Sequence, residues 1–272
     1  MDHLDLATFR PHHFDACRED FAGNGDIGRY VIIPGSNGRA GEIADRYFHN
    51  VTVKPSPRGH HLYLGEMVRD GRTIQMAAIA TGMGAPSVDL ILSELIFLGA
   101  RRFLRIGTAG GMQPDVRVGD VVFATAAVRD ESTSGNYVPP CFPAVADLEM
   151  ALAARQLAAG RDHAVKFGIV HSKDSLYARE FLCGPMADEH RAFMAKLRAY
   201  GVVASEMEAS HLFVLSQVYA RQMGQAIRSG CVLGVIGDDS PFADSALCTQ
   251  AIERAVDFGV ELVGRLALSE MP

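Results

Sequence analysis

Tryptophan is absent from this sequence of 272 residues, and cysteine is scarce. The five cysteines are odd in number and scattered along the chain: Cys17, Cys141, Cys183, Cys231 and Cys248. No two of them approach the spacing of metal ligands, and an odd, scattered set does not form a disulfide framework. This usage indicates a protein of a reducing compartment.

Long apolar runs and an excess of positive charge are also lacking. No apolar stretch reaches the roughly 20 residues that cross a membrane, and Asp2, His3 and Asp5 interrupt the N-terminus where a signal peptide would be apolar. The formal net charge is −6, which argues against a general nucleic-acid or anionic-membrane surface. We therefore expect a cytoplasmic protein without nucleic-acid or membrane partners, in which a local cluster of arginines binds any anion.

The remaining composition, 48% hydrophobic and 21% charged, is typical of a soluble globular protein. The length suits one large α/β domain. No Pro/Ser-rich linker, internal repeat or low-complexity segment divides the chain. We predict a single domain over residues 1–272, in which residues 1–28 form a polar and irregular N-terminal extension.

Strand-like and helix-like patterns alternate along the chain. The predicted strands cover residues 30–33, 61–68, 73–80, 101–106, 119–125, 166–171, 202–204 and 231–236. The predicted helices cover residues 38–48, 87–98, 145–159, 187–200, 206–223 and 248–266. Such alternation predicts an α/β fold of three layers, α/β/α, with a central mixed, mostly parallel sheet.

Three glycine-rich turns are predicted to follow strands, at residues 35–39, 82–86 and 107–111. Ligands of open α/β sheets bind at the carboxyl ends of strands. Arg105 lies inside the apolar run before the third turn, where a guanidinium is costly unless a negative group meets it. The residues alone leave two interpretations open, an oxyanion site and an arginine paired with a structural carboxylate.

Other charged residues stand near these turns and strand ends. Arg39 and Arg58 are further anion candidates, and each is also compatible with a solvated or structural cation. Glu208 lies where a helix is predicted to open, so it either stabilises the helix dipole or accepts hydroxyl groups of a sugar. Asp238 and Asp239 follow the last strand, as a turn or as an acid–base pair.

Three rival sites have weak patterns. The segment 82–87 has two of the three glycines of a dinucleotide fingerprint but ends in Ser87, and no acidic residue follows at the expected distance. No GKS or GKT triplet exists, which excludes a Walker-type site. His60-His61 and the segment 188–190 lack metal-ligand spacing, so we expect no metal.

Five motifs together resemble the nucleoside phosphorylases of the uridine phosphorylase type, within the wider nucleoside phosphorylase and nucleosidase superfamily. They occur in order across roughly residues 30–240, as PGSNGR (34–39), TGMGAPS (81–87), FLRIGTAGGMQP (103–114) with VGDV (118–121), FPAVAD (142–147) and EMEAS (206–210). Each motif alone is weak, and the combination is specific.

The resemblance implies a dimer or a ring-shaped hexamer in which neighbouring subunits share active sites. By position, Gly35, Arg39, Arg105 and Thr108 would bind phosphate, and Arg58 is similar to the arginine lent to a neighbour's phosphate site. For the sugar, Met207 matches the residue beneath the ribose and Glu208 the residue on its hydroxyls, while His13 (or His12) resembles a histidine that reaches a neighbour's ribose 5′-hydroxyl.

The base pocket departs from the family pattern. Uridine phosphorylases carry a Gln-x-Arg pair just after the tyrosine that matches Tyr177, and here that pair is missing, with Arg179 as a substitute from a shifted position. Asp238 stands where purine-cleaving relatives have the acid that acts at N7. We assign Tyr177, Arg179 and Asp238 to the base and leave the identity of the base open.

The implied activity is that of a pentosyltransferase, which cleaves the N-glycosidic bond of a nucleoside with phosphate to give a free base and (deoxy)ribose 1-phosphate. Arg105, Glu208 and Asp238 are the catalytic candidates, and inorganic phosphate is a co-substrate, with no other cofactor. The alternatives are a purine nucleoside phosphorylase, a hydrolytic nucleosidase, and a nucleoside-binding protein without turnover.

Overall fold

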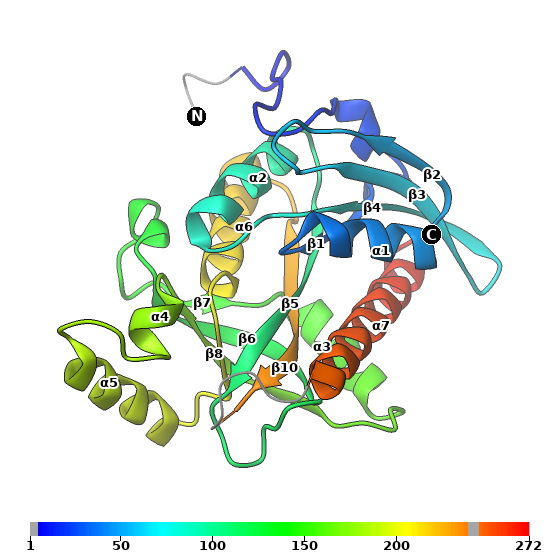
Figure 1. The fold of residues 1–272 in the computed structure, drawn as a ribbon. Helices are drawn as coiled ribbons and strands as arrows, with labels where there is room; N and C mark the ends of the chain where they lie inside the picture. The colour runs from blue at the N-terminus through cyan, green and yellow to red at the C-terminus, as the bar shows by residue number, and fades with distance from the viewer. Residues whose placement is uncertain (1–4, 239–244, 272) are drawn as a thin grey trace.

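The computed structural model describes residues 5–238 and 245–271. Ten strands form one sheet (Figure 1). They are β1 Tyr30–Pro34, β2 His49–Lys54, β3 Leu62–Arg69, β4 Arg72–Ile79, β5 Arg102–Gly111, β6 Val121–Asp130, β7 Ala144–Val145, β8 Val165–Lys173, β9 Ala204–Glu206 and β10 Arg228–Gly237.

The strands follow the order β10-β6-β8-β9-β5-β1-β4-β3-β2, and β10 also pairs with β5. That extra pairing closes five strands, β5, β10, β6, β8 and β9, into a ring, while β1, β4, β3 and β2 extend from it as an open sheet. The sheet is mixed, as expected, and antiparallel pairs are as frequent as parallel ones among the described strands. Closure of the ring was not foreseen from the sequence, because pairing between distant strands leaves no local pattern.

Helices cover both faces of the sheet (Figure 1). The α-helices are α1 Asn37–Tyr47, α2 Ala85–Phe97, α3 Leu148–Ala158, α4 Leu176–Arg179, α5 Ala187–Ala199, α6 Ala209–Met223 and α7 Ser245–Glu270, and short 3-10 helices span Arg18–Phe21 (η1) and Thr133–Asn136 (η2). In Figure 1, α2 and α6 lie on one side of β5, and α3 and α7 lie on the other. No helix in the described ranges combines the length and the apolar character needed to cross a bilayer.

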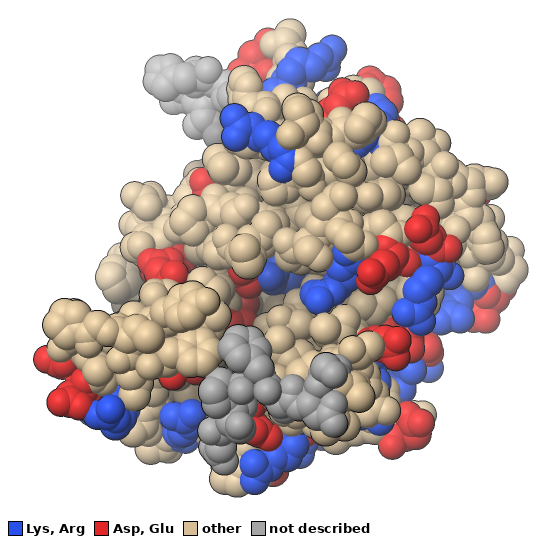
Figure 2. All heavy atoms as spheres, in the orientation of Figure 1, with Lys and Arg blue, Asp and Glu red and all other residues tan. Residues whose placement is uncertain are grey.

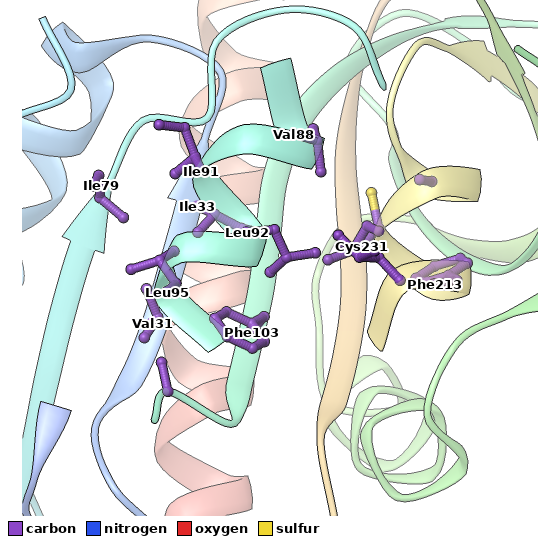
Figure 3. Close-up of a cluster of buried hydrophobic side chains, with 14 of the residues drawn as sticks. Val31, Ile33, Ile79, Val88, Ile91, Leu92, Leu95, Phe103, Phe213 and Cys231 are labelled. Carbon is purple, nitrogen blue, oxygen red and sulfur yellow. The ribbon is translucent and has the colours of Figure 1, made fainter. Parts of the chain in front are cut away.

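The strand β1 shows why two cores form. Its side chains alternate between the faces of the sheet: Val31 and Ile33 join the core under α2 and α6, whereas Tyr30 and Ile32 join the core under α1 and α7. Figure 3 shows the first of these cores, with Leu92 of α2 among the labelled side chains. Both faces of β1 are therefore buried, which accounts for its continuous apolar run.

Two local predictions were wrong, and both concern the site. The third glycine segment is not a turn, because β5 continues through Gly107 to Gly111, where Gly110 pairs with Ser205 of β9. The helix predicted from residue 206 begins at Ala209 instead. Glycine and glutamate have low strand propensity, but pairing with neighbouring strands overrides that preference here.

Candidate active site

A cavity of about 570 Å³ opens at the ends of the strands in the middle of the sheet. Its lining comes from segments far apart in the sequence: the loop after β1, the turn after β4, the second half of β5, the ends of β8, β9 and β10, and helices α4 and α5. Figure 2 shows Lys and Arg atoms beside Asp and Glu atoms in the recessed middle of the face that it presents. The cavity is thus both basic and acidic, although the chain as a whole is acidic.

Two arginines mark one end of the cavity. Arg39, in the first turn of α1, and Arg105, on β5, both line it, together with Gly35 and Thr108. Burial and the neighbouring positive charge of Arg105 lower the pKa of Arg39. Among the described residues, none makes a hydrogen bond or ion pair with the Arg39 guanidinium. Two like charges are thus held close together, an arrangement that an anion between them would stabilise.

Glycine makes room for the Arg105 guanidinium. A Cβ on Gly35 would lie 3.6 Å from Nη2 of Arg105, and a Cβ on Gly107 would lie 3.5 Å from its Nε. That Nε is buried and has no hydrogen-bond partner in the described part of the chain. An unpartnered buried donor is costly, and a bound ligand is one way to satisfy it.

Arg105 is also paired with a carboxylate. It is 4% exposed, its Nη2 lies 2.6 Å from Oε2 of Glu208, and its Nη1 donates to Thr81 Oγ1 at 2.9 Å. Burial is the largest single influence on Arg105 and lowers its pKa, but the charge and hydrogen bond of Glu208 act together with the nearby Cys231 and Glu206 and raise that pKa overall. The other Glu208 oxygen accepts the backbone N–H of Gly84 at 2.6 Å. Both interpretations of Arg105 left open by the sequence therefore hold at once, since it faces the cavity and has a carboxylate partner.

A second glutamate lies behind the first. Glu206, the last residue of β9, is 3% exposed, and its Oε2 accepts the backbone N–H groups of Glu208 and Ala209 at 2.8 and 2.9 Å. Its other oxygen accepts the hydroxyl of Ser172. Burial and the nearby charge of Glu208 raise the pKa of Glu206. Glu206 thereby fixes the chain that carries Met207 and Glu208 into the cavity.

Another part of the cavity wall is formed by Lys173, Glu180 and Ser205. Lys173 is only 1% exposed, and its Nζ lies 2.9 Å from Oε1 of Glu180 and donates to Ser205 Oγ at 2.8 Å. Burial is the largest single influence on Glu180 and raises its pKa, but the charge and close approach of Lys173 act together with Ser205 and His171, so the pKa of Glu180 falls below its ordinary value overall. The two groups therefore form an ion pair in which Lys173 is buried and Glu180 is partly exposed.

The cavity brings together most of the residues that the sequence assigned to it. Seven of them line it: Gly35, Arg39, Arg105, Thr108, Met207, Glu208 and Asp238. Asp238 also lies 3.9 Å from Arg117, through its Oδ2. Asp239 is outside the described residues.

Four assigned residues do not line the cavity of this chain. Arg58 is exposed on the loop before β3. Nδ1 of His13 donates to Oε1 of Glu94, 2.8 Å away. Tyr177 is 68% exposed on α4.

Arg179, the fourth, is held away from the cavity by other partners. Its Nη2 lies 2.7 Å from Oδ1 of Asp130, its Nη1 contacts His190, and its guanidinium stacks over the ring of Phe193 at 4.7 Å. Arg179 stands at a position shifted from that of the family's Gln-x-Arg pair, and its side chain lies on the side of α4 that faces away from the cavity. The expectation that Arg179 replaces the missing Gln-x-Arg pair in the cavity is therefore wrong.

Sequence reasoning missed Lys173, Glu180 and Arg198, all of which line the cavity. A lysine at the end of an apolar strand was a usable signal, because an ammonium is rarely buried without a partner. Glu180, seven residues later, was the available partner. Arg198 had no signal, since it lies on an amphipathic helix among other charged residues.

Comparison with known proteins agrees with this arrangement. A family model described as the phosphorylase superfamily matches residues 29–263. A uridine phosphorylase of Treponema pallidum is 36% identical over 256 residues, which is 91% of this chain and 93% of that protein. A DeoD-type purine nucleoside phosphorylase of Listeria welshimeri is 32% identical over 203 residues, 74% of this chain and 81% of that protein.

The fold is shared as well. A crystal structure of uridine phosphorylase from Vibrio fischeri ES114, in complex with 6-hydroxy-1-naphthoic acid, superposes with a TM-score of 0.76 and 23% sequence identity, covering 96% of this chain and 98% of that one. The family match extends across β1 to β10 and into α7, so it includes every strand of the sheet and the whole lining of the cavity. The chain belongs to the phosphorylase superfamily.

Proposed function

We propose that this protein is a nucleoside phosphorylase of the uridine phosphorylase type, which transfers the sugar of a nucleoside to inorganic phosphate. One observation carries the proposal. Arg39 and Arg105 lie together at a glycine-lined end of the cavity, and Arg105 is joined to Glu208, the carboxylate assigned to the sugar. An anion held by the two arginines would therefore lie next to the sugar.

The arginine end is suited to a phosphate nucleophile. Phosphate between Arg39 and Arg105, with the Thr108 hydroxyl beside it, is oriented toward the sugar and keeps its negative charge close to the anomeric carbon. Phosphorolysis develops positive charge on that carbon as the N-glycosidic bond breaks, so the anion stabilises the transition state as well as attacking it.

The sugar would lie between the phosphate and the base. Glu208 has lone pairs left on both carboxylate oxygens after its bonds to Arg105 and Gly84, so it can accept ribose hydroxyl hydrogens. Met207 offers an apolar surface to the sugar ring. The bond pair of the cleaved C1′–N bond leaves with the base, a phosphate oxygen forms the new bond to C1′, and the proton of hydrogen phosphate balances the proton that the base takes up.

Purine cleavage is a second candidate, and it rests on Asp238. Its carboxyl group lines the cavity, and protonation of a purine at N7 is a task for an acid in that position. The similarity to a DeoD-type purine nucleoside phosphorylase favours the same reading. For this role we predict that Asp238→Asn reduces cleavage of inosine far more than cleavage of uridine, whereas an equal loss on both would count against Asp238 as the acid.

We further propose a cytoplasmic homo-oligomer with shared sites. Arg58 and His13 lie outside the cavity of their own chain. In an oligomer, Arg58 would contact the phosphate and His13 the ribose 5′-hydroxyl that are bound in the cavity of a neighbouring subunit. Mixing Arg39→Ala subunits with Arg58→Ala subunits, each expected to bind phosphate poorly in its own assembly, tests this. Recovered activity on mixing supports shared sites, and no recovery from subunits that do mix contradicts them.

The test of the main proposal is a panel of nucleosides incubated with and without inorganic phosphate. We expect free base and ribose 1-phosphate in equal amounts, only when phosphate is present. Equal release of base without phosphate would indicate a hydrolytic nucleosidase. Binding without release would indicate a nucleoside-binding protein, and either result would refute phosphorolysis.

A further inference from the structure

The ion pair of Lys173 and Glu180 has no role in the site described so far. Lys173 ends β8 and Glu180 follows α4, and both side chains line the cavity. Their charged atoms, Nζ and Oε1, lie 2.9 Å apart. A buried lysine that serves only stability is commonly replaceable by an apolar residue. Because Lys173 is buried and its partner Glu180 is partly exposed on a cavity wall, the position of the pair points to a ligand.

The ion pair lies at the right distance from the phosphate end. Strand β5 carries Thr108 at that end and Gly110 two residues further on, which corresponds to roughly 7 Å of strand. Gly110 pairs with Ser205, whose hydroxyl contacts Lys173. A sugar fits between the two ends, and a base attached to it reaches the ion pair.

A hydrogen-bond chain fixes the direction of the Lys173 ammonium. Asp130 can only accept, so His171 carries its hydrogen on Nε2, which lies 2.8 Å from Asp130 Oδ2. Its Nδ1 then accepts the hydroxyl of Ser205 at 3.0 Å, and Ser205 Oγ is left to accept from Lys173. Arg179 holds Asp130 from the outer side.

The ammonium and the carboxylate each keep capacity for a ligand. Lys173 Nζ donates to Ser205 Oγ at 2.8 Å and, over a longer distance of 3.4 Å, to the carbonyl oxygen of Glu206, whereas Glu180 Oε1 is 2.9 Å away as an ion-pair partner that accepts no hydrogen bond from the described residues. The side chain of Glu180 is 24% exposed toward the cavity, and a carboxylate has about four acceptor positions. The pair therefore presents a donor and an acceptor side by side.

We propose that Lys173 and Glu180 read the base of the nucleoside through a ring carbonyl and the ring N–H next to it. The ammonium donates to the carbonyl oxygen and the carboxylate accepts the N–H. Uracil, thymine, hypoxanthine and guanine have this edge. Cytosine and adenine have the reverse pattern, an amino group beside an unprotonated ring nitrogen. In the same orientation, their amino group would face the Lys173 ammonium, a donor, and their ring nitrogen would face the Glu180 carboxylate, an acceptor.

This inference rests on the proposed function and narrows its substrate class to oxo-bases of either ring size. It also contributes to the reaction. As the glycosidic bond breaks, the electron pair spreads into the base and onto its carbonyl oxygens, and the charge of Lys173 stabilises the oxygen that it contacts. The same interaction thus selects the base and favours its departure.

The experiment compares kcat/KM for two matched pairs, uridine against cytidine and inosine against adenosine. The wild type is expected to prefer the oxo member of each pair. In Lys173→Met, both preferences shrink by about 10- to 100-fold, chiefly because the oxo substrates lose a charge-assisted hydrogen bond. Lys166→Met, on the same strand and partly exposed beside Asp115, is the matched control and leaves both ratios unchanged.

Glu180→Gln is the second variant, because removal of a buried ammonium can impair folding. Its amide offers a donor to the ring nitrogen of cytosine or adenine, so cytidine and adenosine gain relative to the oxo members. Binding of free uracil and cytosine, measured by calorimetry with phosphate present, gives the same ratio without turnover.

Two outcomes overturn the inference: a wild type that prefers the amino members, or variants of Lys173 and Glu180 that leave the ratio of the two members unchanged, including variants that slow both members equally. If release of the base depends on phosphate but the kcat/KM ratios do not change in the variants, the inference is refuted and the proposed function is not. Failure of phosphate to promote release from any nucleoside refutes the proposed function, and the calorimetric ratio still decides whether the ion pair reads the base.

Discussion

Nη2 of Arg105 lies 2.6 Å from Oε2 of Glu208, and both side chains are nearly inaccessible to solvent. In the proposed function, this pair joins the part of the cavity assigned to phosphate to the part assigned to the sugar. It also joins two distant parts of the chain, since Arg105 belongs to β5 and Glu208 precedes α6. Any change at one residue therefore leaves a buried charge on the other.

The first prediction concerns the stability of this pair. Arg105→Ala is expected to abolish phosphorolysis and also to lower the free energy of unfolding by about 3–5 kcal/mol, because the Glu208 charge remains buried without its partner. Urea denaturation measures the loss. Arg105→Ala combined with Glu208→Ala should destabilise by clearly less than the sum of the single variants. Strict additivity would show that the two groups do not interact.

The second prediction separates phosphate binding from stability. Arg39 has no partner among the described side chains, so Arg39→Ala should leave the unfolding free energy within about 0.5 kcal/mol of the wild type. The KM for phosphate should rise by about 10- to 100-fold, since one charge-assisted hydrogen bond to the anion is lost.

Arg46→Ala is the control for Arg39. Arg46 lies on the same helix, is about half exposed, and contacts Asp257 at 3.7 Å, away from the cavity. Its removal should leave the KM for phosphate unchanged. If Arg46→Ala raised the KM for phosphate as much as Arg39→Ala does, the effect would come from the lower positive charge of the protein as a whole. Arg39 would then make no specific contact with the anion.

The third prediction tests the space beside Arg105. A Cβ on Gly35 meets Nη2 of Arg105 and the carbonyl oxygen of Gly82 at 3.6 Å each, which are ordinary contacts, so Gly35→Ala should fold normally. The methyl group would occupy part of the anion end and raise the KM for phosphate. Gly38→Ala, where nothing lies within 4 Å of the new Cβ, is the control and should change neither property. An unchanged KM for phosphate in Gly35→Ala would show that the anion does not bind beside Gly35.

The sequence predicted the fold through local patterns. Alternation of Val31 and Ile33 with Tyr30 and Ile32 reflects two buried faces, and such a pattern is visible without any partner strand. Closure of the ring depends on β10 meeting β5 and β6, which no local pattern encodes. For the same reason the glycines of β5 were mistaken for a turn.

The sequence predicts site residues whose backbone position is set by a motif. It does not predict residues whose side chain can point in more than one direction. Arg105 and Glu208 lie on strands and strand ends whose neighbours hold them in place. Arg179 lies on the four-residue helix α4, where a shift of one position changes the face, and Asp130 was available to bind it. The position of Lys173 at the end of an apolar strand indicates burial, but its contacts with Glu180 and Ser205 are visible only in the folded chain.

The last prediction concerns pH. Burial and the charge of Glu208 raise the pKa of Glu206 in the folded protein above its ordinary value of 4.5. Below pH 4.5 the carboxyl is protonated in both states and has no effect. As pH rises toward the folded pKa, ionisation favours the unfolded chain, so Glu206 progressively lowers stability.

Glu206→Gln keeps an oxygen for the N–H groups of Glu208 and Ala209 but cannot ionise. The unfolding free energy of Glu206→Gln relative to the wild type should therefore increase between pH 4.5 and 7, measured by urea denaturation at each pH. A difference that stays constant over this range, or decreases, would show that Glu206 is as easily ionised in the folded protein as in the unfolded chain.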